Sequence, residues 1–358
     1  MILKQIPEDF VVKEVLGKEP LGRGNYVWFT VKKRNWDTLK LISVLAKRLN
    51  ITRKKIGYAG LKDHKSVSYQ TFSVLGVSIK AVEDVKIKDT EFSDFSYNTE
   101  SVRLGDLEGN CFSIVARDID KKDAEKAKNK IKTISKGILN IYDSQRFGGR
   151  NVTQFVGKGI IKSNFEEAVF IYLTKTYKGE PDEVRKARKR LTEEGDVKEA
   201  LKYFPGFLNW EIAILNYLVE HPKDYTGAIN ILPKTLQLMF IHGYQSYIWN
   251  LTARECINKK LNPEDIALVG FNTRLGSSKV DKIIKSILSK EKIKLEDFRI
   301  RALPRLSCEG SSRKFLIFPK DLQSSWGEDE LNKGKKKLVI SFQLEKGAYA
   351  TQVVKSLF

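Results

Sequence analysis

The sequence is poor in the residues that build disulfide frameworks and transition-metal sites. It has three cysteines and three histidines among 358 residues, and Cys111, Cys256 and Cys308 lie far apart. There is no Cys-x-x-Cys pair, and the histidines are not spaced with the cysteines as in a zinc site. We therefore expect no bound metal and no disulfide framework, and the reduced cytoplasm is the expected compartment.

Long apolar runs and nucleotide fingerprints are also missing. No run of about 18 apolar residues occurs, so we expect no membrane-spanning helix. The first fifteen residues are charged and strand-like and lack the apolar centre of a signal peptide. Neither G-x-G-x-x-G nor G-x-x-x-x-G-K-[ST] is present, and no Ser or Cys nucleophile has a recognisable base nearby.

Positive charge, by contrast, is abundant. The chain has 64 Lys and Arg against 44 Asp and Glu, a net charge of +20 at pH 7, and the excess spreads along its whole length. Such a charge favours a polyanionic partner, because each phosphate that is neutralised releases counterions. Since 41% of the residues are hydrophobic, sizeable cores can form. We expect a globular protein that binds nucleic acid; a basic protein without an anionic partner is the alternative.

The secondary structure that the sequence predicts changes along the chain. In the first third, strands are expected at 10–15, 26–32, 67–74 and 111–116, and helices at 36–49 and 124–135. Helices then dominate, at 165–177, 182–194, 209–219, 236–257 and 280–289. A strand at 338–344 and a short helix close the chain. This order predicts one mixed-sheet domain built from both ends, with a helical domain inserted; tandem independent domains are the alternative.

A Gly-rich turn leads into a charged stretch at residues 57–70, GYAGLKDHKSVSYQ. Asp63 stands there beside Lys62 and near Lys65, whose charges favour an ionised carboxylate. An ionised Asp can act as a nucleophile, a general base or a metal ligand. No partner carboxylate accompanies it, as a two-carboxylate hydrolase would require. From spacing alone, a turn-stabilising Asp is the simpler interpretation and a catalytic Asp the alternative.

Basic and aromatic side chains alternate in residues 139–159, LNIYDSQRFGGRNVTQFVGKG. The segment holds Arg146, Arg150, Lys158, Tyr142, Phe147 and Phe155 among four glycines. This mixture suits single-stranded RNA, because rings stack on bases while Arg and Lys hold phosphates. The alternative is an ordinary Gly-rich connection whose aromatic residues belong to a core.

Six segments, in order along the chain, resemble the TruD family of pseudouridine synthases, in its archaeal type. They are KQIPEDFVVKE (4–14), YAGLKDHKSVSYQ (58–70), LEGNCFSIVAR (107–117), LNIYDSQRFG (139–148), YQSYIWN (244–250) and KGAYATQVV (346–354). The resemblance implies an α+β fold: a mixed, largely antiparallel catalytic sheet domain with a mostly helical TRUD domain inserted. We place the catalytic domain at residues 1–158 and 322–358, and the insertion at 159–321.

The resemblance also implies a reaction, the isomerisation of a tRNA uridine, typically at position thirteen, to pseudouridine without cofactor or metal. The family's nucleophile, the Asp of the AG-x-KD block, is Asp63 here. The Lys ahead of the PEDF block, which approaches that Asp in the family, is Lys4. The Asn and the aromatic residue that hold and stack the target base are Asn140 and Tyr142. Further expected substrate contacts are Arg146, Phe147 and Lys62.

Some features depart from the family pattern or stay open. Family members commonly have Phe at the position of Tyr142, and Asp143 and His64 also differ from the usual residues. Whether Asp63 attacks C1′ or C6, or removes a 2′ proton, is left open. We expect a cytoplasmic monomer that holds tRNA in a basic cleft between the two domains. The rival hypotheses are a non-catalytic RNA-binding or tRNA-chaperone module, and a metal-dependent nuclease, for which clustered carboxylates are lacking.

Overall fold

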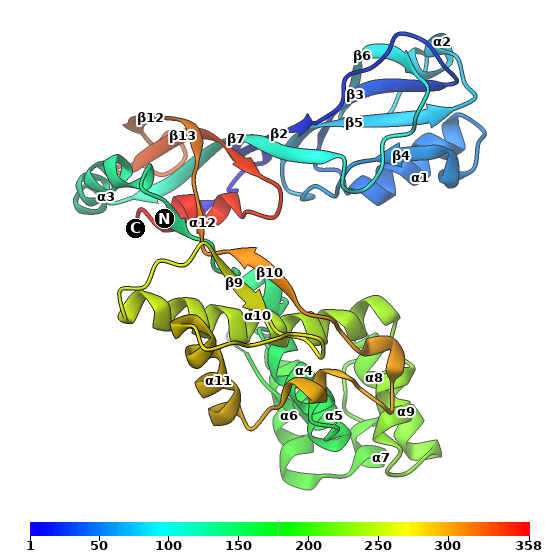
Figure 1. Cartoon of the computed structure of the whole chain (residues 1–358). Helices are drawn as coiled ribbons and strands as arrows, with labels where there is room; N and C mark the ends of the chain where they lie inside the picture. The colour runs from blue at the N-terminus through cyan, green and yellow to red at the C-terminus, as the bar shows by residue number, and fades with distance from the viewer. Residues whose placement is uncertain (178) are drawn as a thin grey trace. The chain divides into compact units, whose positions relative to one another are not determined.

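The computed structural model describes residues 1–177 and 179–358, apart from the side chains of Ser144 and Gln145. The chain forms two compact units (Figure 1): unit 1 combines residues 1–138 with 317–358, and unit 2 is residues 139–316. The chain passes between them at two short paired strands, β8 (Ile138–Leu139) and β11 (Leu316–Ile317). Unit 1 therefore draws on both ends of the chain.

Unit 1 is built on a nine-stranded sheet with the order β12-β13-β7-β2-β5-β3-β6, while β1 pairs with β7 and β4 with β5. The strands are β1 (Ile2–Leu3), β2 (Phe10–Leu16), β3 (Tyr26–Arg34), β4 (Ile56–Tyr58), β5 (Val67–Leu75), β6 (Thr90–Asn98), β7 (Leu107–Ile119), β12 (Lys320–Glu328) and β13 (Lys336–Glu345). The pair β2–β5 is parallel, with Val11 opposite Val67, and the other pairs of this sheet are antiparallel. This confirms the predicted α+β class with a mixed, largely antiparallel sheet.

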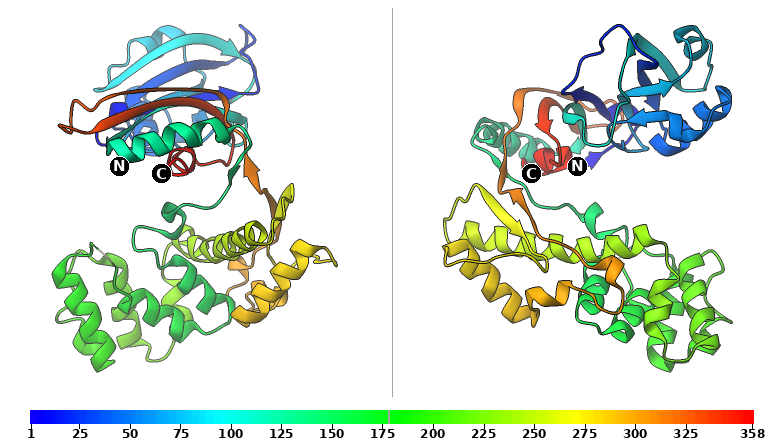
Figure 2. Two further views of the ribbon diagram at one scale, coloured as in Figure 1. Left: turned by 90° about the vertical axis from the view of Figure 1, so that its left-hand side faces the viewer. Right: turned by 45° about the vertical axis from the view of Figure 1, so that its right-hand side comes forward.

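Two of the apolar clusters of unit 1 pack between the sheet and helices, whose ribbons Figure 2 shows from two sides. The helices are α1 (Thr38–Arg48), α2 (Ile79–Glu83), α3 (Lys121–Ile134) and α12 (Ala350–Lys355). Alternate apolar residues of β7 and β13 pack with α3 and α12, and those of β3 and β5 pack with α1 and α2. The helix α1 begins where Asp37 accepts a hydrogen bond from Lys40 N at 3.0 Å.

Unit 2 is mostly helical. Its helices are α4 (Thr153–Ile161), α5 (Phe165–Thr174), α6 (Asp182–Glu194), α7 (Val197–Ala200), α8 (Asn209–Glu220), α9 (Tyr225–Asn230), α10 (Lys234–Asn258) and α11 (Lys279–Glu291), and the strands β9 (Asp265–Leu268) and β10 (Ser311–Lys314) pair beside them. The 25-residue α10 begins after Pro233 and is buried along most of its length, because α4, α11 and β9 all pack on it. In the part of the chain that the structure describes, no helix is long and apolar enough to cross a membrane.

The Gly-rich segment 139–159 belongs to unit 2, so the compact unit begins twenty residues before the expected insertion. The reason is α4, which packs against both α5 and α10. A Cβ atom on Gly157 would lie 2.1 Å from Phe240 O, and one on Gly159 would lie 2.9 Å from Ala168 Cβ. These glycines let helices approach one another closely. The assignment of catalytic and inserted domains to particular boundaries stays a prediction.

Candidate active site

Lys4 and Asp63 meet in unit 1 although 59 positions separate them. Lys4 follows β1, Asp63 lies between β4 and β5, and Lys4 Nζ donates to Asp63 Oδ2. The ammonium also lies 4.0 Å from the centre of the Phe10 ring. The Lys4 side chain is 14% exposed and that of Asp63 is 50% exposed. The expected approach of Lys4 to Asp63 is therefore present, and it leaves a paired carboxylate open to a ligand.

Lys4 adopts an uncommon backbone conformation. Its φ is +58°, in the left-handed region that few side-chain-bearing residues occupy. The residues that follow are tied down: Ile6 N donates to Asp9 Oδ2 at 3.0 Å, and Gln5 Oε1 accepts from Asn332 Nδ2 at 2.8 Å. These bonds hold the chain in the turn that directs Lys4 to Asp63.

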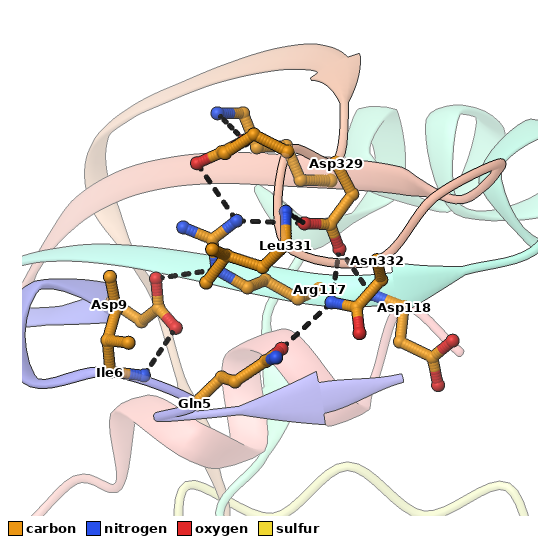
Figure 3. A network of polar contacts seen from close by, with 10 residues as sticks. Gln5, Ile6, Asp9, Arg117, Asp118, Asp329, Leu331 and Asn332 are labelled. Atoms are coloured by element: carbon orange, nitrogen blue, oxygen red, sulfur yellow. Dashed lines mark hydrogen bonds and ion pairs between the residues drawn. The ribbon is translucent and has the colours of Figure 1, made fainter.

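A buried ionic network anchors that turn to distant parts of unit 1 (Figure 3). Arg117 of β7 donates to Asp9 Oδ1 at 2.8 Å and to Asp329 Oδ1 at 2.9 Å. Asp329 Oδ2 accepts from Asp118 N and from Asn332 Nδ2, each at 2.8 Å. Burial opposes the ionisation of Asp329, but these hydrogen bonds outweigh it and lower its pKa to about 2. The start of the chain is thus fastened to the turn between β12 and β13.

The loop that carries Asp63 is closed by backbone and hydroxyl groups. Ser66 Oγ donates to Asp63 O at 2.6 Å, and Asn35 N donates to Ser66 O at 3.1 Å. Thr38 Oγ1, at the start of α1, accepts from Lys62 N at 3.1 Å. The carbonyl of Asp63 therefore takes part in the turn, whereas its carboxylate pairs with Lys4.

Lys62 differs from the expectation drawn from its position in the sequence. Its Nζ donates to Glu14 Oε1 at 2.6 Å, and the two side chains are 6% and 1% exposed. A carboxylate buried as deeply as that of Glu14 needs a cation beside it, and Lys62 turns inward to supply one. The structure does not present this ammonium to a substrate phosphate.

Asn140 is held in unit 2 by three consecutive residues far along the chain, Arg313, Lys314 and Phe315. Its backbone N donates to Phe315 O at 2.9 Å and its Nδ2 to Lys314 O at 3.0 Å. Arg313 Nε donates to Asn140 O at 3.0 Å, and Arg313 Nη2 donates to Asn140 Oδ1. Sequence reasoning missed Arg313, which lies in no recognised segment.

Tyr142 lies in a cluster of aromatic and guanidinium groups. Its ring meets the edge of Trp249 at 5.8 Å between centroids, and the guanidinium carbons of Arg313 and Arg146 lie 4.1 and 5.4 Å from its centre. Asn250 brackets its backbone: Tyr142 N donates to Oδ1 at 2.9 Å, and Nδ2 donates to Tyr142 O at 3.0 Å. The signal for Trp249 and Asn250 was present, because both belong to the YQSYIWN segment.

The basic residues of segment 139–159 divide into two groups. Arg146 Nε donates to Ser246 Oγ at 3.0 Å beside Tyr142, and Phe147 is buried. Arg150 donates to Glu211 Oε1 at 3.1 Å, and Lys158 donates to Glu291 Oε2 at 2.6 Å. Arg150 and Lys158 thus pair with carboxylates of unit 2, which for these two residues agrees with the alternative of an ordinary connection.

The expected site residues therefore form two sets. Lys4, Lys62 and Asp63 belong to unit 1, and the expected base-holding residues belong to unit 2. Within residues 1–177 and 179–358, no group of three or more His, Cys, Asp and Glu side chains is placed to hold a metal ion.

Comparison with known proteins gives consistent matches. The family model described as tRNA pseudouridine synthase D (TruD) matches residues 1–267 and 253–357. A "Probable tRNA pseudouridine synthase D" of Methanosarcina acetivorans is 35% identical over 99% of this chain and 91% of its own length. One of Archaeoglobus fulgidus is 39% identical over 76% of this chain and 67% of its own length.

A solved structure agrees as well. The crystal structure of a candidate tRNA pseudouridine synthase D (TruD) from Methanosarcina mazei superposes with a TM-score of 0.86 at 32% identity. It covers 99% of this chain and 92% of its own. Sequence and fold thus match over nearly the whole length, and the chain belongs to the TruD family of tRNA pseudouridine synthases.

Proposed function

We propose that this protein isomerises a uridine of tRNA, at position thirteen, to pseudouridine, with Asp63 as the nucleophile. The observation that carries the proposal is the contact of Lys4 with Asp63, which brings the family's two motif residues together at a half-exposed carboxylate. Membership of the TruD family supports the reaction and the substrate class. We also propose that the protein acts as a monomer and that it is located in the cytoplasm. Light scattering tests the oligomeric state, and cell fractionation tests the location.

The reaction exchanges one bond of the nucleoside for another. The N1–C1′ bond breaks, uracil turns in the site, and a C5–C1′ bond forms while C5 loses a proton and N1 gains one. Asp63, whose carboxylate accepts a hydrogen bond from the ammonium of Lys4, promotes the first step. It does so as a nucleophile, by attack at C1′ or at C6. The alternative is removal of a 2′ proton, in which Asp63 acts as a general base instead.

The uridine must leave its stack before its glycosidic bond can be reached. In this proposal Asn140 hydrogen-bonds to the extruded nucleotide, Tyr142 stacks on its base, and Arg146 and Phe147 also contact the substrate. Arg313 engages both Asn140 and the Tyr142 ring, and Tyr142 is 8% exposed. A base can therefore stack on the Tyr142 ring only if neighbouring side chains move aside.

The decisive experiment is Asp63→Asn. Pseudouridine is mapped by carbodiimide-dependent reverse-transcriptase stops on tRNA with uridine or cytidine at position thirteen. We expect wild type to modify the uridine tRNA, and Asp63→Asn to bind it within a few-fold of wild type but to form no pseudouridine. Asp321→Asn is the matched control, because Asp321 is exposed and its φ of +53° suits Asn.

Other outcomes separate the rival hypotheses. Normal turnover by Asp63→Asn would exclude Asp63 as the nucleophile. Intact, unmodified tRNA after incubation with wild type would favour a non-catalytic RNA-binding protein, whereas fragments would indicate a nuclease.

A further inference from the structure

We propose that Lys62 is a positioning residue: its ion pair with Glu14 holds the loop that carries Asp63, and it does not bind a tRNA phosphate. The inference rests on the proposed function for its turnover readout, whereas its tRNA-binding readout does not need turnover. In the same proposal, Glu14, Gln70 and Thr38 also help to hold the loop that carries Asp63.

Glu14 is the centre of this support. Its Oε1 accepts from Lys62 Nζ at 2.6 Å and from Gln70 Nε2 at 3.1 Å, and its Oε2 accepts from Thr71 N at 3.1 Å. Both oxygens of a carboxylate that is 1% exposed are therefore engaged. Removing Lys62 alone would leave this charge buried without its cation, which is far more damaging than losing a surface ion pair.

Gln70 and Thr38 add further hydrogen bonds to the loop that carries Asp63. Gln70 Nε2 also donates to Gly60 O at 3.0 Å, and Gln70 Oε1 accepts from Thr38 Oγ1 at 2.9 Å. The same hydroxyl accepts from Lys62 N at 3.1 Å. The chain is thus held at Gly60, at the backbone of Lys62 and at the side chain of Lys62, immediately before Asp63.

These contacts come from β2, β5 and α1, the rigid elements of unit 1. A reacting group held by such elements keeps its geometry, and a displacement of about 1 Å can cost a hundredfold in rate. Lys65, in the same loop, is exposed and supplies a matched control for charge.

The test is a double-mutant cycle with Lys62→Met and Glu14→Gln, measuring kcat, KM and the salt dependence of tRNA binding. We expect each single variant to lower kcat about tenfold to a hundredfold, with tRNA affinity within about threefold of wild type and an unchanged salt slope. The double variant loses no more than the worse single variant, because no unpaired charge remains. In the control cycle with Lys65→Met and Glu14→Gln, we expect the effects of the two substitutions on kcat to be independent of each other.

The opposite result is equally clear. Lys62→Met could instead weaken tRNA binding and lower the salt slope by about one, both with Glu and with Gln at position 14. That result would show that Lys62 binds a phosphate, and it would overturn the proposal. This binding comparison decides the question even if wild type makes no pseudouridine, an outcome that overturns the proposed function instead.

A second variant covers the case in which Lys62→Met does not fold. Thr38→Val keeps the shape of the side chain but removes the acceptor for Lys62 N. It should lower kcat without changing KM, and Thr38→Ser should restore it. An unchanged kcat in Thr38→Val would contradict the positioning role.

Discussion

At the scale of single residues, Lys33 shows how a buried charge affects stability. It lies on β3, is 1% exposed, and its Nζ donates to Trp36 O at 2.7 Å. Burial lowers its pKa to about 8, and Lys62 adds to this effect, whereas the carboxylates of Asp37, Glu14 and Asp63 oppose it. The unfolded chain therefore holds a proton between pH 8 and 10.5 that the folded protein releases.

We expect Lys33→Met to raise the free energy of unfolding at pH 7. For wild type, this free energy should rise between about pH 8 and 10.5, because the unfolded state binds more protons there, and the variant should lack this rise. Urea unfolding at a series of pH values measures both effects. Lys40→Met, at an exposed position on α1, should change neither; a wild-type profile without the rise would refute the explanation.

The motif residues of the site could be predicted, but their support could not. Asp63 and Lys4 stand in recognisable segments, and their contact followed from the resemblance. Glu14 has no special local signal, since a strand can expose or bury a glutamate. Its burial depends on the parallel pairing of β2 with β5, which brings Gln70 and Thr71 to it. Only tertiary structure shows that Lys62 points inward.

At the scale of secondary-structure elements, the close packing of α4 on α10 depends on Gly157. A Cβ atom there would meet the backbone of Phe240 at 2.1 Å, so one helix must shift. We expect Gly157→Ala to destabilise the protein by about 1–3 kcal/mol, in spite of alanine's better helix propensity. Urea unfolding measures the change.

Gly206 provides the matched control. A Cβ atom there would meet nothing within 4 Å. Gly206→Ala should therefore be neutral or slightly stabilising. Equal losses in the two variants would show that close packing at Gly157 is not the cause.

Elements with a strong periodic pattern were predictable, and those without one were not. The helix α6 has the predicted bounds, because Pro181 precedes it and charged residues cover its exposed face. The strand β12 was missed, because this edge strand is mostly exposed and polar and lacks alternation. The helix α5 ends at Thr174, before the expected residue 177.

At the scale of the whole molecule, the two units differ in how the chain builds them. Unit 2 is one continuous segment, and its ends meet where Asn140 N donates to Phe315 O at 2.9 Å. Unit 1 needs both ends of the chain, because β13 pairs along β7 and shares a core with it.

We therefore expect residues 139–316 to fold when expressed alone, and residues 1–138 to fold incompletely, with the core that β7 shares with β13 unformed. Joining residue 138 to residue 317 through a short Gly-Ser linker should restore unit 1, since β8 and β11 pair at that point. Circular dichroism and hydrogen exchange measure the outcome. A cooperative, folded 1–138 fragment would contradict the role given to β13.

The left-handed backbone conformation of Lys4 should make glycine more stabilising than alanine at this position, which is the reverse of their usual order. Lys4→Ala and Lys4→Gly both remove the ammonium beside Asp63, but only glycine adopts a φ of +58° without steric penalty. The glycine variant should be more stable than the alanine variant by about 1–2 kcal/mol, which urea unfolding measures. The backbone conformation alone thus favours glycine at this position, and the proposed pairing of Lys4 with a reacting Asp63 is the reason that we infer for a lysine there.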